Sequence, residues 1–196
     1  MNTNLVKIVK LIQKKQFAEA KKECSILIDN KCNDPEIYNV HAITCFQLDD
    51  HEKAIEILRK KGQKVAANRA ERESTEGVVL LKINEEKTEG VIISLNCETD
   101  FVAKNKDFLN FASEILNLSE NLNSIEELLN TKIGSLSLSD KLVEQTGIIG
   151  EKIEIGNFKK LSGKHIGGYV HAGNKIAAMV ALTGSTPASE EVSKNV

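Results

Sequence analysis

The chain has 196 residues, of which 41% are hydrophobic and 28% are charged, and its formal net charge is −2. These totals are typical of a soluble globular protein with one compact domain and a smaller second one. No run of about 18 apolar residues occurs, and the first residues do not resemble a signal peptide, so we expect neither a membrane span nor secretion.

The cysteines and the charge distribution give further expectations. The four cysteines have no Cys-x-x-Cys spacing, and we expect reduced thiols in a cytoplasmic protein rather than disulfides or metal ligands. They are Cys24, Cys32, Cys45 and Cys97. Residues 1–72 have 14 Lys and Arg against 10 Asp and Glu, with the basic excess in Arg59–Arg72. No aromatic residue interleaves these basic residues, so a solvated connector is favoured over a direct nucleic-acid site.

Residues 1–61 are predicted to be entirely helical. Apolar residues recur there at helical spacing in four segments. Pro35 suits the first turn of the third helix, which Asp34 can cap, and Gly62 is expected to end the fourth helix. Residues 62–76 are then expected to form a basic connector helix.

Two of these segments suggest an internal repeat. "FAEAKKEC" and "HEKAIEIL" align at a shift of 34 residues, which matches Ala20 to Ala54 and Cys24 to Leu58. This is the period of tetratricopeptide repeats, whose units are antiparallel helix pairs. Four amphipathic helices that pair by chance remain the alternative.

After the connector, apolar residues recur at every second position, which predicts strands. Gly77–Ile83 and Val91–Cys97 are expected to pair antiparallel around the polar loop Asn84–Gly90. Three helical segments should follow. Phe108 belongs to the first of them, Ser124 can cap the second, and Gly147 is expected to end the third.

The remainder returns to strands and defines the fold class. The predicted strands are Lys152–Leu161, Gly167–His171 and Lys175–Leu182. Gly173 and Asn174 readily adopt positive φ, so they predict a tight turn between the last two strands. Residues 187–196 resemble the start of a helix. The order predicts an α+β protein, in which an all-α N-terminal region precedes a core, residues 77–186, with a small antiparallel sheet packed on helices.

The end of the second strand raises a question of function. After Cys97 the chain turns through Glu98-Thr99-Asp100 and places Phe101 and Val102 at a corner exposed to water. Thr99 or Asp100 can cap a short turn there, before a new helix begins near residue 107. Phe101 could fold back onto the core or stand out for a partner. The local pattern leaves both alternatives open, although Lys104 and Asn105 interrupt the apolar stripe that would otherwise join Phe101 to Phe108.

Four stretches in this region resemble the elongation factor Ts family. "NCETDFVAKN" looks like the signature of that family. Three further stretches are similar to its connector, its strand entry and its last hairpin: "AIEILRKKGQKVAANRAERESTEG", "IIGEKIEIGNF" and "GGYVHAGNKIAAMVAL", the last with Lys175 in place of the usual Arg. The matches are collinear and cover about residues 54–182.

The resemblance implies a guanine-nucleotide exchange factor for GDP-bound elongation factor Tu. It implies that Asp100 and Phe101 insert near the Mg²⁺ and phosphate site of that partner. Together with the interrupted stripe, the resemblance predicts that Phe101 is at least partly exposed. The implied partner-binding residues are Thr99, Asp100, Phe101, Val102, Ile149, His171 and Gly173. Residues 77–186 would be the N-terminal half of the family's dimerisation-type core, so self-association is a further option.

The N-terminus departs from the family. The run Thr-Gly-Ala-Gly-Met-Met-Asp-Cys of its usual ubiquitin-associated-like domain is absent, and the repeat-like helices stand in its place. The alternative function is therefore a helical-repeat adaptor with an exchange-inactive core, which would bind a peptide in a groove lined by Tyr38, Asn39 and His41.

An enzyme is the third hypothesis, and no motif supports it. A Gly-rich phosphate loop, His-Glu-x-x-His and Gly-x-Ser-x-Gly are all missing from the sequence, and the four His are scattered. Glu151 and Glu154 are interpreted as surface charges on a strand. We therefore expect a binding protein with no catalytic residues, cofactor or metal.

Overall fold

The computed structural model describes residues 3–32 and 34–194, and the chain divides into two compact units. The helical unit comprises the residues up to Ala70 together with Val143–Gly150. The core unit comprises Glu71–Leu142 and the residues from Glu151 onward. The return of residues 143–150 to the helical unit was not predicted from the sequence.

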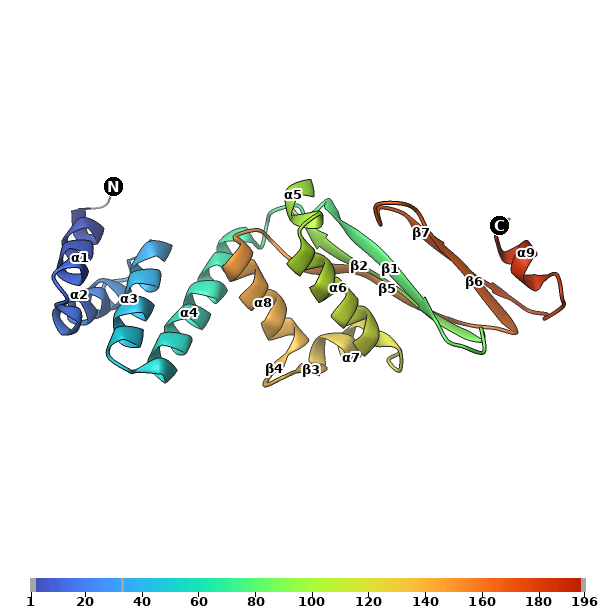
Figure 1. Cartoon of the computed structure of the whole chain (residues 1–196), viewed down its shortest axis with the longest axis horizontal. Helices are drawn as coiled ribbons and strands as arrows, with labels where there is room; N and C mark the ends of the chain where they lie inside the picture. Colours follow the sequence, from blue (N-terminus) through green and yellow to red (C-terminus); the bar gives the residue numbers. More distant parts are fainter. Residues whose placement is uncertain (1–2, 33, 195–196) are drawn as a thin grey trace. The chain divides into compact units, whose positions relative to one another are not determined.

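The helical unit is built on two antiparallel helix pairs, which are coloured blue to cyan in Figure 1. Its elements are α1 (Thr3–Gln13), α2 (Phe17–Asp29), α3 (Pro35–Gln47) and α4 (His51–Arg69). Asp34 caps α3 as predicted, because its side chain accepts a hydrogen bond from the backbone N of Glu36 at 3.0 Å. Cys24 of α2 and Ile37 of α3 are fully buried in one apolar cluster of this unit.

The prediction that α4 ends at Gly62 is wrong. Gly62 is buried within the helix, which continues to Arg69, so only the first part of the predicted connector is helical. Gly62 is instead the point at which another helix crosses α4: a Cβ atom added at Gly147 would lie 2.4 Å from the Cα atom of Gly62, whereas a Cβ atom at Gly62 would make an ordinary 3.5 Å contact with the Val143 carbonyl. The helix that carries Gly147, α8 (Leu138–Ile149), likewise continues two residues past the predicted end.

The core unit contains the strands, and its α+β class is as predicted. Its strands are β1 (Glu76–Ile83), β2 (Glu89–Cys97), β3 (Lys132–Ile133), β4 (Leu136–Ser137), β5 (Glu154–Ser162), β6 (His165–Val170) and β7 (Ala177–Leu182). Strands β1, β2 and β5 form an antiparallel sheet in the order β1-β2-β5, whereas β6 and β7 pair only with each other. The small β3–β4 hairpin was not predicted.

Each face of the three-stranded sheet has its own cover. The helices that lie entirely in the core unit are α5 (Asp100–Ala103), α6 (Lys106–Ser119), α7 (Ile125–Asn130) and α9 (Ser189–Lys194). Lys82 of β1 donates a hydrogen bond to Asn117 of α6 at 3.0 Å, so the alternate residues that include Lys82 face α6. Leu81 lies on the opposite face, where a Cβ atom added at Gly168 of β6 would meet its side chain at 3.1 Å. The β6–β7 hairpin therefore covers the face opposite α6 (Figure 1).

No helix within residues 3–32 and 34–194 is long and apolar enough to cross a membrane. The four cysteines are free thiols, and three of them are buried. Burial raises the pKa of Cys24 to about 12, with a smaller contribution from the neighbouring Cys45 thiol.

Candidate partner-binding site

The candidate site is the corner where β2 passes into the four-residue helix α5. Thr99 has extended backbone angles and is the N-cap of α5, where its hydroxyl accepts a 3.5 Å hydrogen bond from the backbone N of Val102. The helix ends after one turn, and Asn105 caps the next helix with bonds to the backbone N of Asp107 and Phe108. Two successive caps thus create the short turn that the sequence predicted.

Two carboxylates fix the corner to the segment that precedes β5. The backbone N and the hydroxyl of Thr99 both donate to the Glu151 carboxylate, at 3.0 and 2.7 Å. In the opposite direction, Glu98 accepts a hydrogen bond from the backbone N of Lys152 at 2.7 Å. We call these three bonds the carboxylate bracket. Bonds to ionised carboxylates are stronger than neutral ones, so the bracket holds the backbone of residues 98 and 99 firmly.

The interpretation of Glu151 as a surface charge on a strand is wrong, whereas Glu154 does lie on a strand, β5, with 43% of its side chain exposed. Glu151 precedes β5 and binds Thr99, while Glu154 accepts a hydrogen bond from the hydroxyl of Ser74 and forms a 3.1 Å ion pair with Lys152. The signal that could have found Glu151 is its place directly after the Ile-Gly of the family-like strand entry. Its partner, Thr99, is too distant in sequence for any local pattern to indicate.

Asp100 presents its carboxylate at the start of α5. It forms a 2.6 Å ion pair with Lys104, one turn later on the chain. The hydrogen bond from Lys104, with a smaller Coulombic contribution from Lys175, holds the pKa of Asp100 below its ordinary value. Lys175 is itself paired with Glu76 of β1. Asp100 is therefore an anion at neutral pH within a group of alternating charges.

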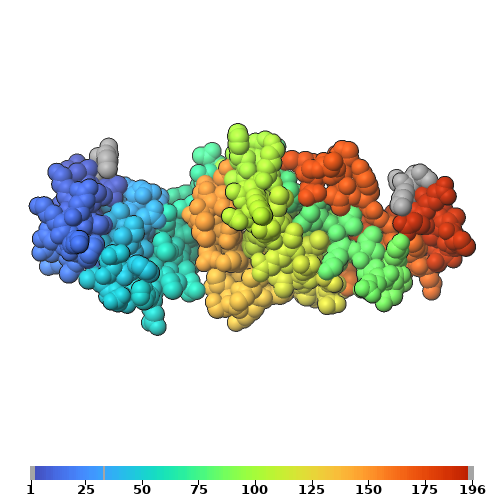
Figure 2. Space-filling view, viewed as in Figure 1, coloured from blue at the N-terminus to red at the C-terminus, as the bar shows by residue number. Residues whose placement is uncertain are grey.

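Phe101 is the most exposed large apolar side chain in the described part of the chain, with 82% of its surface accessible. The prediction that it stands out from the core is confirmed. The same short helix buries Ala103 and half-buries Val102, so its inner side anchors the turn. Figure 2 shows the yellow-green atoms of this segment projecting from the core unit.

Two predicted residues, His171 and Gly173, lie in the turn between β6 and β7. Gly173 and Asn174 have φ of +88° and +56°, so the predicted positive-φ turn is confirmed. His171 is exposed, and its Nδ1 lies 3.1 Å from the Tyr169 hydroxyl. The carbonyl of Asn174 accepts a 2.7 Å hydrogen bond from Val79, which fixes the turn to β1. Lys175 pairs with Glu76, which lies opposite Cys97 in the sheet, so the turn is at the same end of the sheet as the corner.

Sequence reasoning missed two apolar residues of this turn. Tyr169 and Ile176 flank it and are 59% and 66% exposed. Large exposed apolar side chains of this kind are typical of interaction surfaces when they gather around one feature. The alternation of β6 and β7 could have indicated that Tyr169 points outward.

Ile149, the remaining predicted residue, is the last residue of α8 and is half-buried in the helical unit. Its neighbour Ile148 is far more exposed, at 70%. The structure therefore places Thr99, Asp100, Phe101 and Val102 at the same end of the core unit's sheet as His171 and Gly173, whereas Ile149 belongs to the other unit.

The peptide groove of the adaptor hypothesis does not exist as predicted. Tyr38 and His41 are buried, and only Asn39 of the three is partly accessible. The Tyr38 ring is covered by the ammonium of Lys64, 5.2 Å from its centroid, and His41 Nε2 lies 3.3 Å from the Ser25 hydroxyl. Both side chains stabilise the interior of the helical unit.

No group of three or more His, Cys, Asp and Glu side chains in residues 3–32 and 34–194 could hold a metal ion. The geometry instead defines an α+β protein that exposes an aromatic side chain and a carboxylate on a braced corner.

Comparison with known proteins identifies the family of the chain. A family model described as elongation factor TS matches residues 98–196, which include the corner and the β6–β7 turn. Elongation factor Ts of Christiangramia forsetii is 54% identical over 147 residues, covering 75% of this chain and 54% of that relative. For elongation factor Ts of Flavobacterium psychrophilum the identity is 52%, with the same coverage. The chain belongs to the elongation factor Ts family. It spans about half the length of these curated relatives.

Proposed function

We propose that this chain is a guanine-nucleotide exchange factor that promotes release of GDP from elongation factor Tu. Phe101 would insert into apolar packing of the partner near its Mg²⁺, and Asp100 would bring a carboxylate toward the groups that organise the ion and phosphates. The observation that carries the proposal is the 82% exposure of Phe101 on a corner fixed by the carboxylate bracket.

The chemistry of the corner suits this role. A nucleotide-binding loop holds phosphate with backbone amides and Mg²⁺, so a competing carboxylate and a wedged ring weaken both contacts. By linkage, the bound factor and the nucleotide must weaken each other equally. A thousandfold weakening corresponds to about 4 kcal/mol, which one buried aromatic ring and one desolvated charge can largely supply.

The proposal describes a binding protein rather than an enzyme. It needs no catalytic residue, cofactor or direct nucleic-acid contact, and it locates the protein in the cytoplasm with its partner. Thr99 and Val102 would hold the inserted turn, and His171, Gly173 and Ile149 would be further contacts.

The test is release of a fluorescent GDP from elongation factor Tu with wild-type chain and with Phe101→Ala. Because the ring is exposed, this variant should keep its stability to within about 1 kcal/mol while slowing GDP release at least severalfold. Ile26→Ala is the control, since it removes an exposed apolar side chain of α2. Unchanged release with Phe101→Ala, or equal slowing with both variants, would contradict the proposed role of the corner.

A further inference from the structure

The outer side of α3 and α4 carries an apolar surface that lacks a cover. On α3, Ile43 and Phe46 are 50% and 58% exposed, and on α4, Ile55 and Leu58 are 51% and 49% exposed. Spacings of three residues place each pair on one side of its helix. We call these four side chains the α3–α4 face. Four large apolar residues on a two-helix hairpin are typical of an interaction surface.

The first helix pair, which matches this one in sequence at a shift of 34 residues, offers a comparison for the α3–α4 face. The 34-residue shift matches Leu58 to Cys24, which is fully buried in a cluster with Ile37 and Val40 of α3. The first helix pair is therefore covered by α3. In helical arrays, an end unit without a following neighbour requires a polar outer side to stay soluble. This end has an apolar side instead, so a further helical element should cover it.

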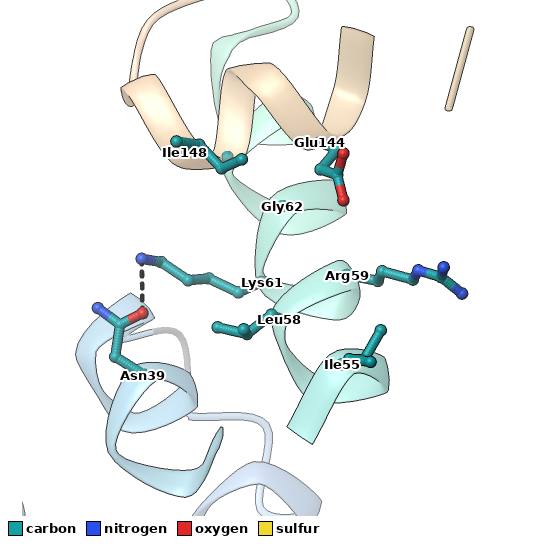
Figure 3. A pocket seen from close by; sticks show the side chains of 9 residues that line it. Asn39, Ile55, Leu58, Arg59, Lys61, Gly62, Glu144 and Ile148 are labelled. Carbon is teal, nitrogen blue, oxygen red and sulfur yellow. Dashed lines mark hydrogen bonds between the residues drawn. The ribbon is translucent and has the colours of Figure 1, made fainter. Parts of the chain in front are cut away.

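Another part of the helical unit covers only one end of α4. The last turns of α8 cross α4 at Gly62 and leave a pocket of about 320 Å³, shown in Figure 3. Leu58, Gly62 and Ile148 contribute to its walls, and Lys61 at its rim donates a 2.8 Å hydrogen bond to Asn39. Ile55 and Arg59 also line this pocket, and Ile55 is still 51% exposed.

The charges along α4 indicate which kind of partner could bind the α3–α4 face. Glu52 and Arg59 are exposed, and within the described residues neither forms an ion pair or side-chain hydrogen bond. They are seven residues apart, or about two turns, on the same side of the helix as Ile55. Glu56 between them is already neutralised by Lys53 and Lys60 at 2.8 and 2.7 Å. The free charges are thus one anion and one cation, placed on either side of Ile55.

We propose that the α3–α4 face binds a second copy of this chain, with the two α4 helices antiparallel about a twofold axis near Ile55. In that arrangement Glu52 of each copy lies opposite Arg59 of the other, and the aliphatic side chains meet at the axis. A twofold interface requires such self-complementarity. This inference does not depend on the proposed exchange function.

Charge reversal tests the arrangement without touching the core. Sedimentation velocity of the full chain, from about 10 µM to about 1 mM in low salt, should show reversible dimers. Arg59→Glu alone and Glu52→Arg alone should each lower the association constant at least about tenfold, because like charges then meet twice. An equimolar mixture of the two variants should restore association, since each then supplies the charges that the other lacks. Leu58→Asp should abolish it, whereas Ile26→Asp on α2 should not.

Three experimental results would contradict this dimer. A wild-type chain that stays monomeric at about 1 mM would overturn the proposal and assign the face to a different protein. Dimers that survive both charge reversals and Leu58→Asp would place self-association elsewhere on the chain. Failure of the mixture to rescue association would reject the antiparallel register.

Discussion

Glu151 is predicted to act as a positioning residue for the exposed corner. Its carboxylate accepts both the backbone N and the hydroxyl of Thr99, at 3.0 and 2.7 Å. A hydrogen bond to a charged group contributes about 1.5–3 kcal/mol, with the low end appropriate for a half-buried side chain. Because both bonds share one side chain, Glu151→Ala should lower the free energy of unfolding by about 2 kcal/mol in total. Glu151→Gln keeps one acceptor and should cost about half as much.

The assay combines urea unfolding with release of fluorescent GDP from elongation factor Tu, normalised to folded protein. Loss of the bracket frees the backbone before Phe101, so release should slow severalfold with Glu151→Ala and less with Glu151→Gln. Glu154→Ala is the matched control. It removes a carboxylate bonded to Ser74 and Lys152, and should cost stability without slowing release. If Glu151→Ala loses stability but exchanges as fast as wild type, the bracket serves the fold alone and this reasoning is refuted.

Three other predictions concern the interior. Gly147→Ala should destabilise the helical unit by about 1–3 kcal/mol, because its Cβ would lie 2.4 Å from Gly62 Cα; an unchanged melting temperature would be inconsistent with that crossing. Burial, followed by the charge of neighbouring lysines, lowers the pKa of His41, so the unfolded chain takes up that proton first. Stability should be full above about pH 6.5 and fall by up to about 1.4 kcal/mol per pH unit below it, and His41→Gln should remove that part of the slope in urea titrations. Burial raises the pKa of Cys97 to about 11, so iodoacetamide should modify half-buried Cys32 well before Cys97, and equal rates would contradict the buried thiol.

The local parts of the fold could be predicted because their signals are local. The alternation of apolar residues predicted β1 and β2. Asp34 caps α3 and Ser124 caps α7 as expected, the latter by accepting a 3.1 Å hydrogen bond from the backbone N of Glu127. The exposure of Phe101 was predicted from the interrupted stripe at Lys104 and Asn105 together with the family signature around it. Each of these inferences needed only residues within one or two turns of each other.

The remaining features depend on contacts between distant segments. Gly62 resembles a C-cap, yet it lies inside α4, where Gly147 packs against it from more than 80 residues away in the chain. Glu151 looked like a solvated charge because Thr99 is separated from it by 52 positions. For the same reason, no periodicity could show that β6 and β7 form a sheet of their own.

The helical unit is discontinuous, and its two parts meet on α4. The sequence motifs of the family begin at Ala54, near the start of that helix, while α1 to α3 precede them. One helix therefore serves two interfaces, since its N-terminal half buries Ala54 and Ile57 against Tyr38, Ala42 and Cys45 of α3, whereas Gly62 meets α8. Any other leading module joined at the start of α4 would have to bury Ala54 and Ile57 in the same way.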